Sequence, residues 1–304
     1  NNIMLKFIVI SDIHLTTQKL LCNGLNSLKR FNLAIESLNN DHPDADFCIL
    51  AGDIADEGKI ESYEIFKEAI SKIKIPFYLT LGNHDSRDNF KKIFKDRYSD
   101  ENGFIQKTID IKNHRIIILD TFDKNLIGEG KLCEKRLNWL DKQIKQNPKI
   151  PTIIVMHHHV SRIQSPYIDV IALENPNDFF KILKKHSNIR HIITGHVHIS
   201  STTYENNIPQ TTIAGCHNSF SLKNFFTPFE YKIEGLKKLN ESSKISNNQI
   251  KEMTKDFDKL EILEGPAQYG VVLSNDISTT IHFHNYIDPH KKLPRSLTKL
   301  DIKI

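Results

Sequence analysis

The sequence predicts an α/β fold in which two β-sheets face each other and helices cover the outer faces. Five short runs rich in Ile, Val, Phe and Leu are typical of buried strands; they are residues 5–10, 47–51, 77–81, 152–156 and 191–194. Segments with helical spacing separate the early runs, whereas the later strands follow one another closely. Two facing sheets with helices outside would bury all of these elements.

Each further element follows from the spacing of its apolar residues. Apolar positions three or four residues apart mark helical faces within 25–38, 63–73 and 137–144. Segments 104–110 and 115–120 are joined by four residues, which leaves no room for a helix and predicts a hairpin. Late strands are expected at 208–214, 269–273 and 278–286.

Every one of the five early runs ends in residues of a metal-binding type. Ligands in such folds gather beyond the carboxyl ends of the strands, so residues that follow five strands should converge on one centre. The candidates, in chain order, are Asp12 and His14, then Asp53, then Asn83, then His157, and finally His196 and His198. The sequence therefore predicts a metalloenzyme.

Seven candidates are too many for one tetrahedral ion and suit two ions that share a carboxylate. The mixture of imidazole, carboxylate and amide oxygen favours ions of the Mn, Fe or Zn type over magnesium or calcium. Gly52, Gly82 and Gly195 each precede a candidate ligand, and we expect them to let the backbone turn sharply there.

The ordered motifs carry a family resemblance. The set Asp12-x-His14, Gly52-Asp53, Gly82-Asn83-His84-Asp85, His157-His158 and Gly195-His196-Val197-His198 resembles the signature of calcineurin-like metallophosphoesterases. Within that superfamily it is most similar to class III cyclic-nucleotide phosphodiesterases and related glycerophosphodiesterases. The resemblance covers residues 4 to about 220. It implies a four-layer αββα sandwich with two mixed sheets, in agreement with the pattern of strands and helices.

The resemblance also implies a role for each residue. The first ion would be held by Asp12, His14 and His198, the second by Asn83, His157 and His196, and Asp53 would bridge them. His84 would face the leaving-group or a phosphoryl oxygen, and Asp85 would orient His84.

Two points depart from or lie outside that pattern. The family usually has proline soon after the paired histidines, but this chain continues with His159 and Val160, so His158 stays an alternative to His157 as ligand. Two roles are open for Asp56, support of a neighbouring ligand or the opening of the following helix, and the second is expected. His217 is expected to be an ordinary histidine without a role in the site.

The implied function is a phosphodiesterase that acts on 3',5'-cyclic nucleotides resembling cyclic AMP, or on small phosphodiesters. It would use two divalent or mixed-valence ions and a hydroxide that bridges them. The alternatives within the superfamily are a phosphomonoesterase and a nuclease, and the alternative from another class is a non-catalytic binding module. An intact ligand set argues against the binding module.

Charge, apolar runs and cysteine content indicate the expected partners and location of the protein. A net charge of +4 is spread along the chain without a basic cluster, which argues against a nucleic-acid partner. No run reaches the roughly eighteen apolar residues of a membrane span, and no signal sequence precedes the first strand. The four cysteines are scattered without metal-ligand spacing, as in proteins of a reducing cytoplasm, which is the expected location. Residues 1–3 precede Met4 and leave open that an export signal was removed.

The chain is expected to form a single domain over residues 1–304 with an insertion at about 221–265. Lys, Asn, Ser and Glu dominate this segment, but its apolar residues have partly helical spacing. We expect one or two amphipathic helices there, which would form a cap beside the active site or a contact between two copies in a homodimer.

Overall fold

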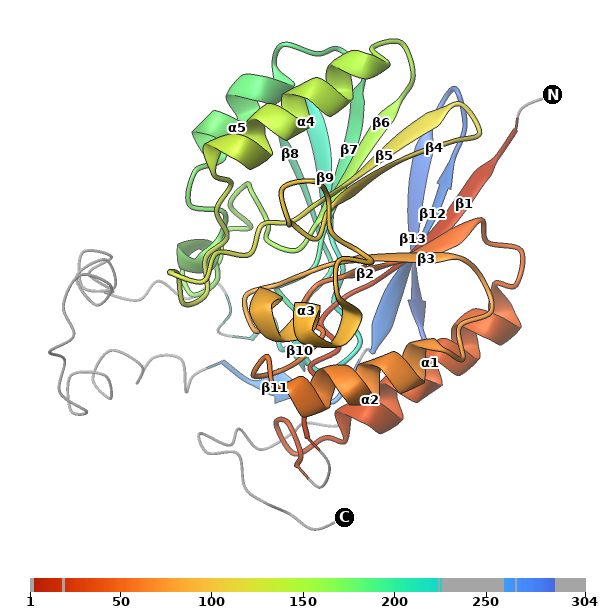
Figure 1. The fold of residues 1–304 in the computed structure, drawn as a ribbon, viewed down its shortest axis with the longest axis vertical. Helices are drawn as coiled ribbons and strands as arrows, with labels where there is room; N and C mark the ends of the chain where they lie inside the picture. The colour runs from red at the N-terminus through yellow and green to blue at the C-terminus, as the bar shows by residue number, and fades with distance from the viewer. Residues whose placement is uncertain (1–2, 18–19, 224, 226–259, 266, 288–304) are drawn as a thin grey trace, which may run out of the picture.

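Two mixed β-sheets form the centre of the fold (Figure 1). The structure is a computed structural model that describes residues 3–17, 20–223, 225, 260–265 and 267–287. The first sheet has the order β13-β12-β1-β2-β3, with β1 (Leu5–Ile10), β2 (Phe47–Ala51), β3 (Phe77–Thr80), β12 (Gln268–Ser274) and β13 (Thr279–Asn285). In it β1, β2 and β3 are parallel, and β12 runs antiparallel to both β1 and β13.

The second sheet has the order β4-β5-β6-β7-β9-β8. Its strands are β4 (Lys107–Ile111), β5 (His114–Leu119), β6 (Thr152–Met156), β7 (Ile189–Thr194), β8 (Ser201–Glu205) and β9 (Ile208–Thr212). The four strands β5, β6, β7 and β9 are parallel, and the edge strands β4 and β8 are antiparallel to their neighbours. The same end of β1, β2, β3, β6 and β7 therefore carries the loops that follow the five predicted strands.

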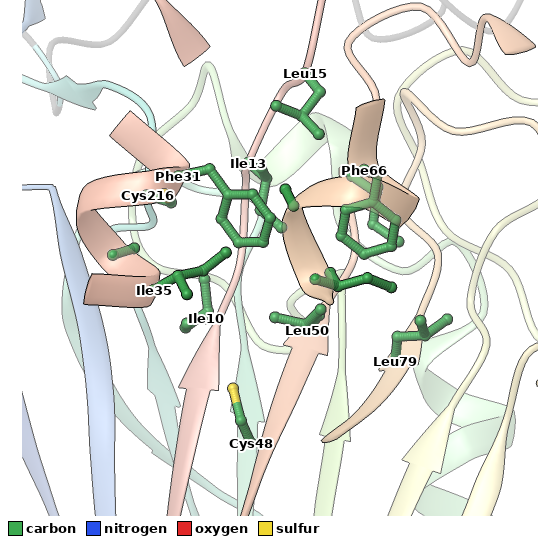
Figure 2. Close-up of a cluster of buried hydrophobic side chains, with 14 of the residues drawn as sticks. Ile10, Ile13, Leu15, Phe31, Ile35, Cys48, Leu50, Phe66, Leu79 and Cys216 are labelled. Carbon is green, nitrogen blue, oxygen red and sulfur yellow. The ribbon is translucent and has the colours of Figure 1, made fainter. Parts of the chain in front are cut away.

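Helices cover the outer face of each sheet (Figure 1). On the first sheet, α1 (Ser27–Asp41) and α2 (Ile60–Ile70) pack Phe31 and Phe66 against Ile10 and Leu50 (Figure 2). α3 (Arg87–Phe94) adds buried Phe90 to the same core. On the second sheet, α4 (Glu134–Gln146) and α5 (Pro176–Leu183) form a separate apolar core with strands β5 to β7.

A third apolar core lies between the two sheets. Alternate residues of a strand point to opposite faces, so Phe7 and Val9 of β1 join this inner core, whereas Ile8 and Ile10 pack under the helices. Because both faces of the central strands are buried, their sequences are continuous apolar runs rather than alternating ones. The predicted αββα sandwich is confirmed.

The hairpin predicted near residue 112 is also confirmed, as β4 and β5. Lys112 and Asn113 connect the strands with φ values of 47° and 58°, which suits a tight two-residue turn between twisted strands. The helices α3 and α5 and the strand β8 were not predicted. Each of the two helices has only eight residues, and so short a segment shows little periodicity.

Most of the predicted insertion, residues 226–259, lies outside the described residues. Its flanks are described: β10 (Ser219–Phe220) pairs with β11 (Ile262–Leu263), and Phe220 lies with its ring 5.5 Å from the ring of His198. Both ends of the insertion thus meet beside a candidate ligand. Among the described helices, none has the length and apolar character needed to cross a membrane.

Candidate metal centre

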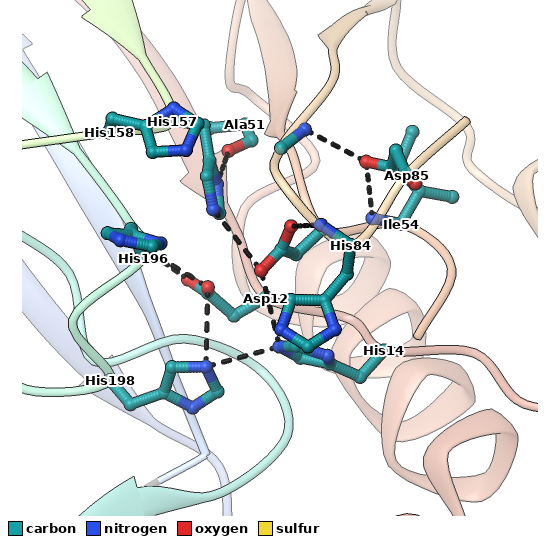
Figure 3. Close-up of polar contacts among 12 residues, drawn as sticks. Asp12, His14, Ala51, Ile54, His84, Asp85, His157, His158, His196 and His198 are labelled. Carbon is teal, nitrogen blue, oxygen red and sulfur yellow. Dashed lines mark hydrogen bonds and ion pairs between the residues drawn. The ribbon is translucent and has the colours of Figure 1, made fainter. Parts of the chain in front are cut away.

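The candidate ligands from distant parts of the chain meet at one end of the sheets (Figure 3). Asp12, His14 and His198 form a first set, in which one ligand atom of each residue lies within 4.8 Å of the others. The Nε2 atoms of His14 and His198 are 3.1 Å apart, and Nε2 of His198 is 3.4 Å from Oδ1 of Asp12. All three side chains are buried, so the set is a preformed cluster of ligand atoms.

Asp53 lies between this set and a second one. Its Oδ2 is 3.6 Å from Nε2 of His14 and 3.2 Å from Nε2 of His157, while its Oδ1 accepts a hydrogen bond from the backbone N–H of His84. A single carboxylate oxygen therefore faces both sets, as the bridging role requires.

His157 and His196 lie together in a second set, and Asn83 is its third predicted member. His157 and His196 lie with their ring centroids 5.0 Å apart. Nε2 of His157 faces Oδ2 of Asp53 at 3.2 Å, and Oδ1 of Asn83 is buried without a hydrogen-bond partner among the described residues. Because buried polar atoms in proteins are nearly always satisfied, the oxygen of Asn83 fits the ligand role that the sequence assigned to it.

The second nitrogen of each ligand imidazole is held by a neighbouring oxygen. Nδ1 of His157 donates to the carbonyl of Ala51 at 2.9 Å (Figure 3), Nδ1 of His198 to that of Asn218 at 2.7 Å, and Nε2 of His196 to that of Ile171 at 3.0 Å. A carbonyl oxygen can only accept, so the hydrogen must sit on the bonded nitrogen. In the neutral ring the other nitrogen then carries a lone pair, the state that binds a metal.

Burial and charge shift the pKa values of these groups. Burial lowers the pKa of His196 and His198, which keeps both rings neutral. Burial would also lower the pKa of His14, but the bond to Asp56 and the nearby carboxylates raise it to about 9. For Asp53, burial raises the pKa, yet the surrounding imidazoles more than offset this and hold it well below its ordinary value. The ionised carboxylate of Asp53 is therefore stabilised by positive charge around it, which bound metal ions would also supply.

Five of the ligand residues adopt the left-handed backbone conformation that is uncommon outside glycine. The φ angles are 55° at Asp12, 51° at His14, 49° at Asp53, 73° at His196 and 53° at His198. Such strain persists where the surrounding structure enforces it, and it is concentrated at functional sites. Of the three glycines expected to let the backbone turn sharply before a ligand, Gly52, Gly82 and Gly195, only Gly52 has a positive φ, of 90°.

Gly82 and Gly195 are required for space. A Cβ atom on Gly195 would lie 2.6 Å from Oδ2 of Asp12, and one on Gly82 would overlap Oδ1 of Asp53. These two glycines therefore let the backbone pass close beside ligand carboxylates.

His84 lies at the open side of the centre, with its ring 4.7 Å from that of His14 and its side chain 42% exposed. Its Nδ1 donates to the backbone carbonyl of Asp56 at 2.8 Å, which leaves Nε2 for a ligand. The structure differs from the expectation for Asp85. That carboxylate accepts hydrogen bonds from the backbone N–H groups of Ile54, Ala55 and Gly82 and from the hydroxyl of Tyr63. Asp85 therefore joins the two ligand loops, and Asp56 is the residue that orients His84.

Asp56 has the contacts of a supporting residue, the alternative that the sequence left open but did not favour. It does not open a helix, because α2 begins at Ile60, and it is only 6% exposed. Its Oδ1 lies 3.1 Å from Nδ1 of His14 and 3.5 Å from Nδ1 of His84. One carboxylate thus supports both a candidate ligand and the exposed imidazole. The sequence does contain an indication of this role. A second acidic residue follows Asp53 by three positions, although a turn at Gly52-Asp53 does not need one.

Nε2 of His157 lies 3.2 Å from Oδ2 of Asp53, as its ligand role requires, but His158 stays an alternative because its Nε2 is also buried without a hydrogen-bond partner among the described residues. Nδ1 of His158 forms a hydrogen bond with the hydroxyl of Thr121 at 2.7 Å, and a Cβ on Gly130 would lie 2.5 Å from the His158 ring. His158 therefore packs against the loop that contains Thr121 and Gly130, although it is close enough to His196 to belong to the same cluster.

Two further histidines border the centre. The ring of His159 lies 5.7 Å from that of His196, and the ring of His217 lies 5.8 Å from that of His14. His217 was treated as an ordinary histidine, and its Nε2 donates to the carbonyl of Cys22. Its buried position against a ligand could not be read from the sequence, because residues 14 and 217 are brought together only by the fold.

Asp56→Asn is expected to weaken divalent-ion binding by the first set about 10- to 100-fold, the usual cost of losing a group that supports a ligand. The amide keeps the shape of the side chain but removes the charge that supports His14. Isothermal calorimetry with Mn²⁺ would measure the change. Asp96→Asn is the matched control, because the side chain of Asp96 is 86% exposed and its ion pair is with Lys91, which is not a candidate ligand. Wild-type affinity in Asp56→Asn would contradict this role.

Comparisons with known proteins agree with the fold and identify the family. Residues 5–200 match the sequence model of a family described as calcineurin-like phosphoesterase. The chain is 33% identical over 216 residues to a probable glycerophosphodiester phosphodiesterase GpdQ of Arcobacter nitrofigilis, which covers 70% of this chain and 79% of that protein. It is 30% identical to a probable cyclic nucleotide phosphodiesterase of Rhodopseudomonas palustris, over 64% of this chain and 72% of that one. Among solved structures, a dimetal phosphatase from Danio rerio has a similar fold, with a TM-score of 0.60 at 13% identity and coverage of 92% and 99%.

Proposed function

Because the chain belongs to the calcineurin-like phosphoesterase family, we propose that it is a phosphodiesterase that hydrolyses 3',5'-cyclic nucleotides or small phosphodiesters with two metal ions. The family membership confirms the resemblance that the ordered motifs predicted. Relatives named as cyclic-nucleotide and glycerophosphodiester phosphodiesterases support the choice of a diester substrate.

The position of the Asp53 carboxylate carries the proposal. One of its oxygens lies 3.6 Å from Nε2 of His14 and 3.2 Å from Nε2 of His157, and these two residues belong to different ligand sets. The donor set of imidazole, carboxylate and amide oxygen fits ions of the Mn, Fe or Zn type. When bound, two such ions would activate water for attack and neutralise the charge on the phosphoryl oxygens.

The protein's own groups then position these ions and handle the leaving group. The carbonyls of Ala51, Ile171 and Asn218 fix the ligand rings before any ion binds, so little reorganisation accompanies binding. His84 has its Nδ1–H committed to Asp56, and its exposed Nε2 is the atom that can donate a proton to the departing oxygen.

A substrate panel tests the proposal. With added Mn²⁺, we expect the protein to hydrolyse cyclic AMP, bis-nitrophenyl phosphate and glycerophosphodiesters faster than nitrophenyl phosphate. Asp53→Ala, prepared in parallel, measures the background from contaminating enzymes. Faster hydrolysis of the monoester would support a phosphomonoesterase, and the absence of hydrolysis on every substrate would support a binding module; either result would contradict the proposal.

A further inference from the structure

An open pocket lies on the helix-covered side of the first sheet, where α1 ends beside β12 and β13. It has a volume of about 600 Å³, and none of its lining residues is a candidate ligand of the metal centre. Its polar lining residues are Lys6, His42, Asp44, Lys112, His282 and His284. The pocket is therefore a polar site of its own, in which imidazoles are the most frequent polar group.

Two imidazoles meet in this pocket. Nε2 of His42 lies 3.2 Å from Nδ1 of His284, and their ring centres are 5.1 Å apart. Without an ion, one of these nitrogens donates a hydrogen bond to the other. At this separation of the nitrogens, an ion about 2.0–2.1 Å from each of them and in line with both rings requires ring centres about 5 Å apart. The two rings are thus placed as a pair of ligands would be.

The hydrogen of the His284 ring is held at its other nitrogen. The hydroxyl of Ser37 donates to Oδ2 of Asp41 at 2.7 Å, so the oxygen of Ser37 can only accept from His284. Nε2 of His284 lies 3.3 Å from that oxygen and 3.3 Å from Oδ2 of Asp41. In the neutral ring Nδ1 therefore presents a lone pair to His42. A carboxylate behind the imidazole is also the common support of a metal-bound histidine.

The end of α1 favours a cation at this place. Asp41 is the last residue of the helix and His42 is its C-cap, and the carbonyl groups at a helix C-terminus carry partial negative charge. Burial, and after it the charges of Lys6 and His284, lower the pKa of His42. Its ring is therefore neutral at neutral pH, which is the form that binds a metal.

The two ammonium groups in the lining are each paired with a carboxylate. Nζ of Lys6 lies 2.5 Å from Oδ1 of Asp44. Nζ of Lys112 lies 2.6 Å from Oδ1 of Asp46. These ion pairs offset the positive charges that would otherwise repel a cation in the pocket.

We propose that His42 and His284 bind one divalent transition-metal ion at a site separate from the metal centre. Imidazole nitrogens favour copper, nickel and zinc over magnesium and calcium. Two protein ligands leave the remaining positions to water, which the open pocket admits. The bound ion joins the end of α1 to the edge strand β13, so it stabilises this edge of the first sheet.

Zinc content tests the proposal directly. After equilibrium dialysis against Zn²⁺ at a series of concentrations, elemental analysis should find one more ion per chain in the wild-type protein than in His42→Gln or His284→Gln. Each of these variants should raise the Kd for that ion more than about tenfold, because loss of a group that only supports a ligand already costs 10- to 100-fold. Asp41→Asn keeps both ligands and should raise the Kd about tenfold.

Melting curves give a second measure. Binding of the additional ion should raise the melting temperature of the wild-type protein, because the unfolded chain does not hold the two rings together. In His284→Gln the same concentration of Zn²⁺ should give no such rise. His186→Gln is the matched control, because His186 pairs with Asp141 at 3.0 Å and does not line the pocket. It should behave as the wild-type protein in both measurements.

Anomalous scattering from crystals soaked in Zn²⁺ shows where the ion binds. A peak is expected between Nε2 of His42 and Nδ1 of His284, in addition to any peaks at the metal centre. Equal zinc contents in the wild-type protein and in both histidine variants would overturn the proposal. A crystal with zinc bound elsewhere and no peak between these two rings would overturn it as well.

Discussion

Asp53→Ala is expected to remove both metal ions from the protein and to lower phosphodiester hydrolysis more than about 100-fold. Loss of a group that only supports a ligand costs roughly 10- to 100-fold, and a bridging carboxylate should cost more. Oδ2 of Asp53 faces His14 in one set and His157 in the other. Among the described residues, no other carboxylate oxygen lies this close to both rings. Removal of the Asp53 carboxylate should weaken both sets together.

Elemental analysis of the purified protein measures this directly. The wild-type protein should contain two ions per chain, and Asp53→Ala should contain far fewer. Asp96→Ala replaces an aspartate that is 86% exposed, and it should retain the wild-type content. A wild-type metal content in Asp53→Ala would show that its carboxylate does not bridge the ions.

His84→Ala is expected to slow turnover of substrates with alkyl leaving groups about 10²- to 10⁴-fold, the usual contribution of a general acid. The loss should be smaller for nitrophenyl leaving groups, which depart without a proton. Metal content should stay nearly unchanged, because Nδ1 of His84 is bonded to the carbonyl of Asp56 and its ring is partly exposed. The neighbouring change Asn83→Ala should instead lower metal content, since Oδ1 of Asn83 is a candidate ligand.

The comparison of kcat for the two leaving groups decides the role of His84. His282→Ala, which removes an exposed imidazole on β13, is a matched control and should leave both rates unchanged. Equal losses for alkyl and nitrophenyl substrates would argue against proton donation. His84 would then be better described as a group that stabilises charge on the phosphoryl oxygens.

The amino-acid sequence determined the layers of the fold and the ligand types. Strands such as 5–10 and 152–156 are visible because burial on both faces leaves a continuous apolar run, a property of a few adjacent residues. The ligands follow directly after these runs, and parallel strands carry their following loops to one edge of a sheet. The apolar runs therefore predicted the strands, and the motifs that follow them predicted the end of the sheets at which the ligands gather.

Only the tertiary structure decided which side chains support the ligands. The contact of Asp56 with His14 spans 42 residues, that of His157 with Ala51 spans 106, and that of His14 with His198 spans 184. No local pattern encodes such pairs, because they depend on the packing of loops from different strands. For the same reason the sequence assigned to Asp85 a contact that Asp56 makes. Residue types are fixed by the chain, but distances between remote side chains are fixed by the packing of the two sheets.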